Sequence, residues 1–230
     1  MTVAAVILAA SPASALVDAD GTPGARRIAN TAWAGGATPV CVCSSDPEES
    51  VAAALANAEV TLVDPVDPAR GPVGQIVNGL DAAIALVSDT DAALVWPARL
   101  VWVDAETVTT LIALHGEDRD AVLHPAFGGE PGWPVLLPVR HLAAFAGLAA
   151  DRMPSDLFAD LAATGIRSRI VETGDPGVTH DVSTARADLP AYDGPPEPAD
   201  AHAHEWGAAG ADEADDAPVP GPARLGAADF

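Results

Sequence analysis

The chain has 230 residues and a formal net charge of −22 at pH 7, with 33 acidic residues against 11 basic ones. A surface of that sign repels phosphate backbones and anionic lipid headgroups, so we expect neither nucleic acid nor a membrane as a partner. All 11 basic residues are arginine, which excludes every mechanism that needs a lysine as phosphate clamp, base or Schiff-base former.

Strand and helix signals alternate from the start of the chain. Residues 3–9 (VAAVILA) form an apolar run typical of a parallel strand buried on both faces, and a small-residue loop is expected over 10–24. A helix over 25–34 would end at Gly35, because glycine is common just after a helix. Strands are expected in TPVCVC (38–43), EVTLVD (59–64) and DAALVW (91–96). A helix is expected between the first two strands, from a cap at Ser45 or Asp46 to Ala56. Another is expected over 75–87, after Gly71 to Gly74 interrupt the chain.

The alternation continues to about residue 173. The expected elements are a helix over 105–115, the apolar segment AVLHPAF (121–127), the turn GGEPG (128–132), the extended segment WPVLLP (133–138), helices near 139–149 and 155–164, and the strand SRIVET (168–173). Repeated strand, helix, strand units with right-handed crossovers predict an α/β fold in which helices cover a mostly parallel sheet. A ligand would then sit at the C-terminal ends of the strands.

The composition changes near residue 190. From residue 191 onward the chain has six prolines, nine acidic residues and one arginine, with few large apolar side chains to offset the entropy of ordering. We therefore predict one domain over 1–190 and a disordered acidic tail over 191–230. Cys41 and Cys43 are the only cysteines, and their i, i+2 spacing in a strand does not suit a disulfide, so a reducing cytoplasm is the expected location.

Several segments in order resemble the MobA-like NTP transferases, and within them the molybdenum-cofactor cytidylyltransferases more than the guanylyltransferases. The segments that carry the resemblance are VILAAS (6–11), GLDAA (79–83), LVWVDAETV (100–108), GWPVLLP (132–138) and DPGVTHDVSTARADL (175–189). The resemblance implies a three-layer α/β/α nucleotidyltransferase fold of the Rossmann-like, GT-A type. It also implies attack by an acceptor phosphate on the α-phosphorus of a nucleoside triphosphate, with Mg²⁺ bridging phosphate oxygens.

The first motif of such enzymes resembles LAAGxSxRMGxxK, whereas this chain has LAASPASALVDAD over 8–20. Ala15 stands at the arginine and Asp20 near the lysine, so the charge is reversed where a triphosphate would bind. Pro12 removes a backbone donor from the loop, and Ser11 and Val17 replace glycines that allow positive φ angles. The candidate nucleotide contacts that remain in this loop are Ala9, Ala10 and Ser11.

The metal-binding motifs depart from the family as well. An ungapped alignment puts Arg99 at the aspartate that holds Mg²⁺ in the family, and Arg99 is therefore a candidate contact for a bound anion. With Arg26 or Arg27 it could form a site for a smaller phosphate ligand, or it could form an ion pair with a carboxylate. Asp181 matches the first aspartate of the closing motif, while Ser183 replaces the second. Asp181 is thus a candidate metal ligand, or alternatively a cap.

These departures favour a catalytically degenerate protein, a pseudoenzyme that serves as a noncatalytic binding or partner subunit. Its partner would be an active homologue or a molybdoenzyme-related protein. The alternative is an active nucleotidyltransferase that uses Mg²⁺ and CTP or GTP to modify a phosphorylated acceptor such as molybdopterin. A third hypothesis is a module that binds a sugar nucleotide or a small anion. Three tryptophans near these motifs either fill volume vacated by the nucleotide or line the core: Trp96, Trp102 and Trp133.

Overall fold

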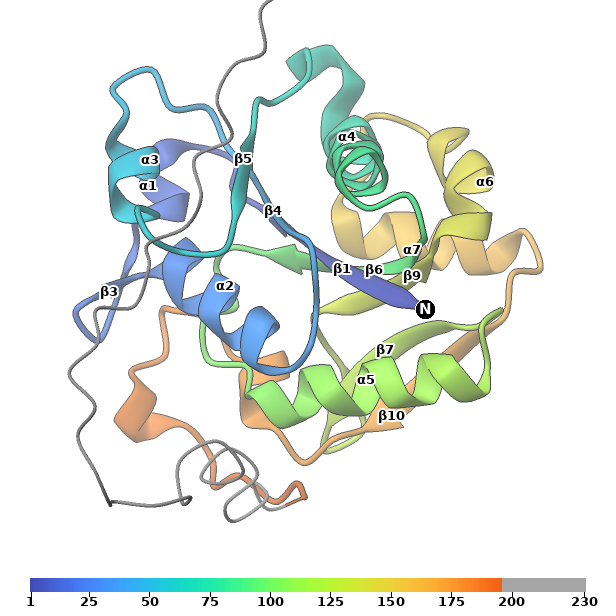
Figure 1. Cartoon of the computed structure of the whole chain (residues 1–230). Helices are drawn as coiled ribbons and strands as arrows, with labels where there is room; N and C mark the ends of the chain where they lie inside the picture. Colours follow the sequence, from blue (N-terminus) through green and yellow to red (C-terminus); the bar gives the residue numbers. More distant parts are fainter. Residues whose placement is uncertain (196–230) are drawn as a thin grey trace, which may run out of the picture. The chain divides into compact units, whose positions relative to one another are not determined.

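The structure is a computed structural model that describes residues 1–195 (Figure 1). The described chain continues past the expected boundary at residue 190, because the Asp193 N–H donates a 2.8 Å hydrogen bond to the Gly174 carbonyl. The rest of the predicted tail, 196–230, lies outside the described residues. No helix among residues 1–195 combines the length and apolar character needed to span a bilayer.

A mixed, mostly parallel eight-stranded sheet forms the centre of the fold. Its order is β10-β7-β9-β6-β1-β4-β5, and β8 pairs with β7 at the side. All neighbouring pairs along this path are parallel except the two made by β9, which runs antiparallel between β6 and β7. The strands are β1 (Thr2–Leu8), β4 (Val40–Cys43), β5 (Thr61–Val63), β6 (Thr90–Pro97), β7 (Val122–Phe127), β8 (Glu130–Pro131), β9 (Val135–Pro138) and β10 (Ser168–Glu172).

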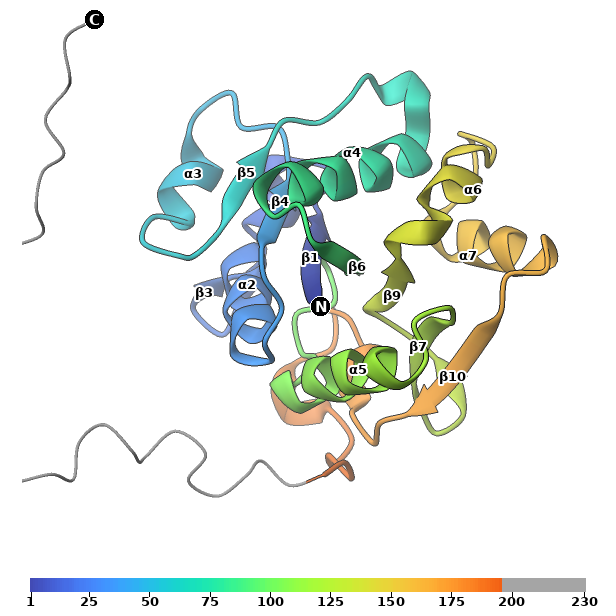
Figure 2. The same cartoon turned by 45° about the vertical axis from the view of Figure 1, so that its right-hand side comes forward.

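Helices cover both faces of this sheet and make three layers (Figure 2). On one face lie α2 (Gly24–Ala34) and α5 (Ala105–Glu117), whose buried residues share one core with Val3, Ala5 and Ile7 of β1. On the other face α4 (Gly71–Leu86), α6 (Leu142–Ala146) and α7 (Pro154–Ala163) enclose a second core that contains Ala4 and Val6. Alternate residues of β1 therefore serve opposite cores, as the pleat of a strand requires. The three-layer α/β/α architecture predicted from the sequence is confirmed.

The remaining short elements lie at the ends of the strands. They are α1 (Pro12–Ala15), α3 (Ser50–Ala54), the hairpin of β2 (Asp18–Ala19) and β3 (Thr22–Pro23), and the 3₁₀ turns η1 (Pro68–Arg70), η2 (Val139–His141), η3 (Pro176–Val178) and η4 (Arg186–Asp188). The expectation of an irregular loop over 10–24 was therefore wrong, since α1 and the β2–β3 hairpin occupy it. Serine capping and a tight turn suffice to order these few residues.

Two helix boundaries also differ from the expectation. The helix expected from residue 75 begins at Gly71, with Pro72 at its first turn. Gly71 has φ +59, and a Cβ there would lie 1.7 Å from the Ala150 carbonyl oxygen. Glycine at this position thus serves a close approach of two backbones and does not interrupt the helix. The helix expected from Ser45 or Asp46 begins at Ser50, although the Asp46 carboxylate does accept hydrogen bonds at its N-terminus.

Candidate functional site

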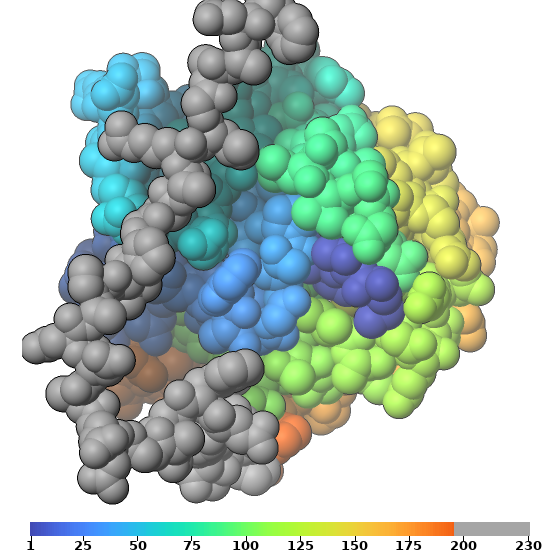
Figure 3. All heavy atoms as spheres, in the orientation of Figure 1, coloured from blue at the N-terminus to red at the C-terminus, as the bar shows by residue number. Residues whose placement is uncertain are grey.

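A cleft of about 790 Å³ opens at the C-terminal ends of β1, β4 and β6. Figure 3 shows the opposite side of the molecule, where the blue start of β1 is exposed between the green segments of α4 and α5. The cleft walls are mostly apolar, and five of the side chains are prolines. The lining residues are Leu8, Ala9, Ala10, Ser14, Cys43, Ser45, Pro65, Val66, Asp67, Pro68, Gly71, Pro72, Gln75, Pro97, Ala98, Arg99, Met153 and Pro154. The structure thus brings three of the predicted contacts, Ala9, Ala10 and Arg99, to one cleft.

Ser11, the fourth predicted contact, is used within its own turn and does not line the cleft. Its hydroxyl accepts a 3.3 Å hydrogen bond from the Ser14 N–H, and the Ser14 hydroxyl accepts a 3.0 Å bond from the Ser11 N–H. This reciprocal pair is a capping box for α1. Ser11 has an extended backbone with φ −160, and Pro12 has no N–H to offer. The polar groups of Ser11 thus cap α1, and a nucleotide contact by Ser11 stays a prediction.

The lysine position of the first motif is also removed from the cleft. Asp20 is exposed in the β2–β3 turn at φ +54 and does not line the cleft. The turn is closed by the Asp18 carboxylate, which accepts a 3.0 Å hydrogen bond from the Gly21 N–H. Asp20 therefore does not replace the positive charge of the family's lysine, and its own carboxylate does not reach the cleft.

Arg99 and Asp181 meet each other although 82 residues separate them. They form an ion pair, and the Arg99 side chain stays 68% exposed while that of Asp181 is 16% exposed. The other Asp181 oxygen, Oδ1, accepts a 2.9 Å hydrogen bond from the Ser183 N–H and another from its hydroxyl. Hydrogen bonding by Ser183, with a further contribution from Arg99, lowers the pKa of Asp181. Both carboxylate oxygens are thus occupied, and the ion-pair interpretation of Arg99 is confirmed.

This arrangement does not fit Mg²⁺. A protein-held Mg²⁺ needs oxygen ligands, usually from carboxylates, at a site free of competing cations. The guanidinium of Arg99 occupies one oxygen of Asp181, and Ser183 offers only a hydroxyl where the family has a second carboxylate. Within residues 1–195, no three His, Cys, Asp or Glu side chains come together as a metal site. Asp181 acts here as an ion-pair and turn residue.

Arg26 and Arg27 do not join Arg99 in an anion site. Arg26 Nη1 donates to the carbonyls of Ala54 and Ala56, at 3.0 and 2.7 Å. Arg27 Nε donates a 3.0 Å hydrogen bond to the Val101 carbonyl, and its guanidinium carbon lies 4.9 Å from the centroid of a Trp102 ring. Both arginines hold segments of the fold together, so Arg99 is the one cationic residue among residues 1–195 that lines the cleft.

None of the three tryptophans lines the cleft. Trp96 is fully buried and donates a 2.8 Å hydrogen bond to the Leu100 carbonyl. Trp102 donates at 2.9 Å to the Thr184 carbonyl, which fixes the closing segment. Trp133 is half-buried and lines two smaller pockets beside the cleft. Two of the three therefore belong to the scaffold.

Sequence reasoning missed the structural importance of Asp175. This carboxylate is 2% exposed and accepts hydrogen bonds from the Asp104 N–H at 2.8 Å and the Thr107 hydroxyl at 2.7 Å. Its other oxygen accepts from the Gly177 N–H at 2.8 Å. Burial raises the pKa of Asp175 despite these bonds. The signal was the DPG sequence itself, which ties the closing segment to the start of α5, where Asp104 is the N-cap.

Cys41 and Cys43 are buried and free, as expected. Burial raises the pKa of the Cys43 thiol to about 12 and that of Cys41 to about 11. Since the thiolate is the reactive form, Cys43 contributes a neutral apolar surface to the cleft and no nucleophile.

The fold is similar to solved nucleotidyltransferases. A nucleotidyl transferase from Methanothermobacter thermautotroptrophicus superposes with a TM-score of 0.63 at 18% identity, covering 81% of this chain and 94% of that one. A 4-diphosphocytidyl-2C-methyl-D-erythritol synthase from Anaerococcus prevotii gives 0.61 at 12% identity, covering 81% and 94%. A Mycobacterium tuberculosis protein solved in complex with manganese gives 0.59 at 17% identity, covering 82% and 98%.

The sequence itself carries the family signal. No curated protein matches the chain at a significant level. The family model for the MobA-like NTP transferase domain, however, matches residues 5–165, which span the sheet from β1 through α7. Every residue that lines the cleft falls within this match. The chain therefore belongs to the MobA-like NTP transferase family.

Proposed function

We propose that this chain is a catalytically degenerate member of its family and acts as a noncatalytic binding or partner subunit. The observation that carries the proposal is the Arg99–Asp181 ion pair. A cation occupies the position that the family pattern gives to a metal-holding carboxylate, and it engages the carboxylate that would have been the other ligand. Phosphoryl transfer depends on charge neutralisation and positioning, so the loss of both groups removes the main source of catalysis.

The charge of the cleft supports the same proposal. Its charged lining residues are Arg99 and Asp67, one of each sign. The Asp67 carboxylate caps η1 by accepting a 2.9 Å hydrogen bond from the Ala69 N–H. Arg99 is already paired with Asp181, so a triphosphate entering this cleft would bring several negative charges to one compensated arginine. Leaving charges unpaired in a partly desolvated site costs several kcal/mol, on the order of the binding energy itself.

The resemblance to the family suggests the class of partner. We propose that the chain binds an active homologue or a molybdoenzyme-related protein in the cytoplasm. Two features support a binding role: the three-layer scaffold is complete, and the cleft keeps a volume of about 790 Å³. The free thiols of Cys41 and Cys43 are consistent with a reducing compartment.

The retained cleft also favours one alternative, an active enzyme that moves a nucleoside monophosphate from CTP or GTP to a phosphorylated acceptor such as molybdopterin. In that case Mg²⁺ would have to be held by the phosphates themselves, with Arg99 released from Asp181. This alternative differs from the main proposal in one measurable respect, which is the release of pyrophosphate.

A turnover assay separates the two. Pyrophosphate release would be measured with Mg²⁺, CTP, GTP or ATP, and molybdopterin, beside an active family member as positive control. We expect no release above background from this chain. In a second experiment, size-exclusion chromatography with light scattering would measure the mass of a mixture of this chain and the active homologue. We expect the mass of a stable complex of the two. Nucleotide-dependent turnover by the purified chain would refute the noncatalytic proposal.

A further inference from the structure

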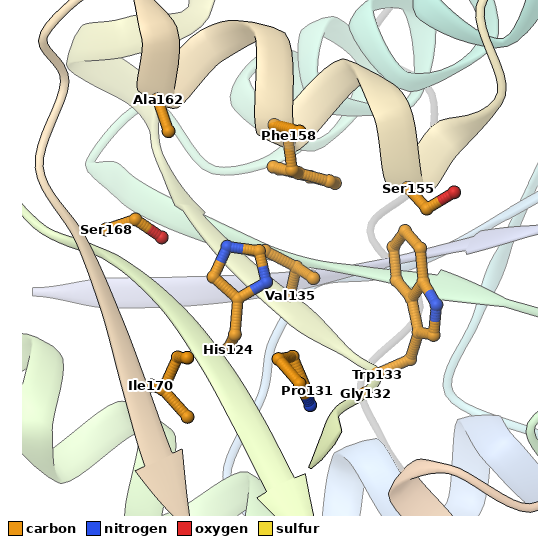
Figure 4. Close-up of a pocket in the computed structure, with 11 residues that line it drawn as sticks. His124, Pro131, Gly132, Trp133, Val135, Ser155, Phe158, Ala162, Ser168 and Ile170 are labelled. Atoms are coloured by element: carbon orange, nitrogen blue, oxygen red, sulfur yellow. The ribbon is translucent and has the colours of Figure 1, made fainter. Parts of the chain in front are cut away.

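A second pocket lies on the α7 face of the sheet, beside the main cleft. It has a volume of about 310 Å³, at the lower end of the range for small-molecule sites. Strands β7, β9 and β10, the segment before β9 and helix α7 form its walls (Figure 4). It shares no lining residue with the main cleft. The lining residues are His124, Pro131, Gly132, Trp133, Val135, Ser155, Phe158, Ala159, Ala162, Ser168 and Ile170.

Three rings face this pocket. The Phe158 ring meets His124 edge to face at 5.7 Å between centroids and an interplanar angle of 89°. Trp133 contacts the same phenyl ring at 5.7 Å and 70°. Figure 4 shows the imidazole in the middle of the group, with the indole on one side and Ser168 and Ile170 on the other. Edges and faces of aromatic rings thus line the pocket, an arrangement that favours a further aromatic ring.

His124 supplies the polar contact. Among residues 1–195, no hydrogen bond is made by either of its ring nitrogens, while the other walls offer the hydroxyls of Ser155 and Ser168. Burial lowers the pKa of His124. The imidazole is therefore neutral near pH 7 and can both donate and accept one hydrogen bond.

The pocket has no formal charge. None of its lining residues is Asp, Glu or Arg. This distinguishes it from the surface as a whole, on which acidic residues outnumber basic ones threefold. A charged ligand would lose hydration here without gaining a counter-charge, whereas a neutral ligand would not.

We propose that this pocket is a binding site for an uncharged aromatic or heteroaromatic molecule of one or two fused rings that carries a hydrogen-bonding group for His124. The ligand ring packs between Trp133, Phe158 and Ile170, and its polar group meets the imidazole. A third pocket, which contains Arg99 and Asp181, lies between this site and the main cleft and shares lining residues with both. The proposed ligand is recognised by residues that do not line the cleft, so the proposal does not require nucleotide transfer.

Calorimetry with three probes of matched shape tests the charge requirement. The probes are 2-naphthol, which is neutral, 2-naphthoate, an anion, and N-methylquinolinium, a cation. We expect saturable binding of 2-naphthol with one site per chain, and at least about tenfold weaker binding of both ions. An absence of 2-naphthol binding, or binding of either ion with equal affinity, overturns the proposal.

Substitutions place the binding in this pocket. Ile170→Arg introduces a long cation at a wall residue that is 59% exposed, and it should abolish 2-naphthol binding without unfolding the chain. Leu86→Arg is the matched control, since Leu86 is 50% exposed at the end of α4 and outside the pocket. His124→Phe keeps a ring but removes the hydrogen bond, so affinity should fall about tenfold. Circular dichroism checks each fold, and unchanged affinity in Ile170→Arg contradicts the assignment.

Discussion

The proposed loss of activity rests at the residue scale on Arg99. The family pattern calls for a carboxylate here, and a guanidinium instead forms an ion pair with Asp181. The sequence alone could suggest that Arg99 pairs with some carboxylate, but the two residues are far apart along the chain, so only the packing of the closing segment identifies the partner. Asp104, by contrast, was predictable as an N-cap because capping is local.

Replacing Arg99 by aspartate should restore metal affinity. Arg99→Asp leaves Asp181 without its cation and puts a second carboxylate beside it, so Mn²⁺ should bind in the micromolar to millimolar range, as monitored by electron paramagnetic resonance. Arg119→Asp is the matched control, because it removes an arginine that lies 3.8 Å from Asp91, away from the cleft. Equal Mn²⁺ binding by the two variants would contradict the assignment of Asp181.

Ser11 has a structural role that stability measurements can detect. Ser11→Ala removes the hydroxyl that accepts the Ser14 N–H, so the free energy of unfolding should fall by about 1 kcal/mol, as for other helix N-caps. Urea unfolding followed by circular dichroism measures the change. Ser88→Ala, at an exposed serine whose side chain makes no hydrogen bond within residues 1–195, serves as the reference. An unchanged midpoint for Ser11→Ala would mean that the capping box is unimportant.

The secondary structure elements differ in how well the sequence predicts them. The apolar runs of β1 and β6 were predictable from their composition, and the end of α2 was predictable from Gly35. The direction of β9 was not, because an apolar segment has the same pattern whether it runs parallel or antiparallel to its neighbours. The start of α4 was missed because Gly71 resembles a helix breaker, while its actual reason is the neighbouring backbone of Ala150.

Glycines inside two helices should respond oppositely to alanine. A Cβ at Gly79 of α4 would lie 2.3 Å from Val6 Cγ1 and 2.9 Å from Cys43 Sγ, so Gly79→Ala should destabilise the fold by about 1–3 kcal/mol through overpacking. In Gly116→Ala on α5 the nearest atom would be Met1 Cε at 3.6 Å, and the change should be neutral or stabilising by up to about 1 kcal/mol. Thermal denaturation of both variants tests the pair, and a Gly79→Ala variant as stable as Gly116→Ala would contradict the packing of α4.

The stability of the whole domain should depend on pH through its buried histidines. His115 is fully buried, with Nε2 3.1 Å from Asp91 Oδ2 and Nδ1 without a hydrogen-bond partner among the described residues. Burial lowers its pKa from the ordinary 6.5, an effect that the hydrogen bond to Asp91 only partly opposes. The unfolded chain then binds the proton more readily than the folded chain, so stability is greatest above pH 6.5 and falls as the pH drops towards the folded pKa.

A substitution at His115 separates its contribution to the pH dependence from that of other titrating groups. Urea midpoints measured from pH 7.5 downward should decrease below about pH 6.5 in the wild type. His115→Gln removes the titrating group while keeping a hydrogen-bond donor for Asp91, so its decrease should be shallower. A residual slope is expected, because burial lowers the pKa of His124 as well. Identical slopes in wild type and variant would show that His115 is not responsible.

The central claim is that the cleft of this nucleotidyltransferase fold no longer holds a metal-bound triphosphate. Its most direct test is calorimetric titration of the wild-type chain with CTP, GTP and ATP, each with and without Mg²⁺. We predict no binding in the micromolar range and no difference when Mg²⁺ is added. Micromolar affinity that requires Mg²⁺ would contradict the claim, because Arg99 and Asp181 would then have to separate to admit the metal.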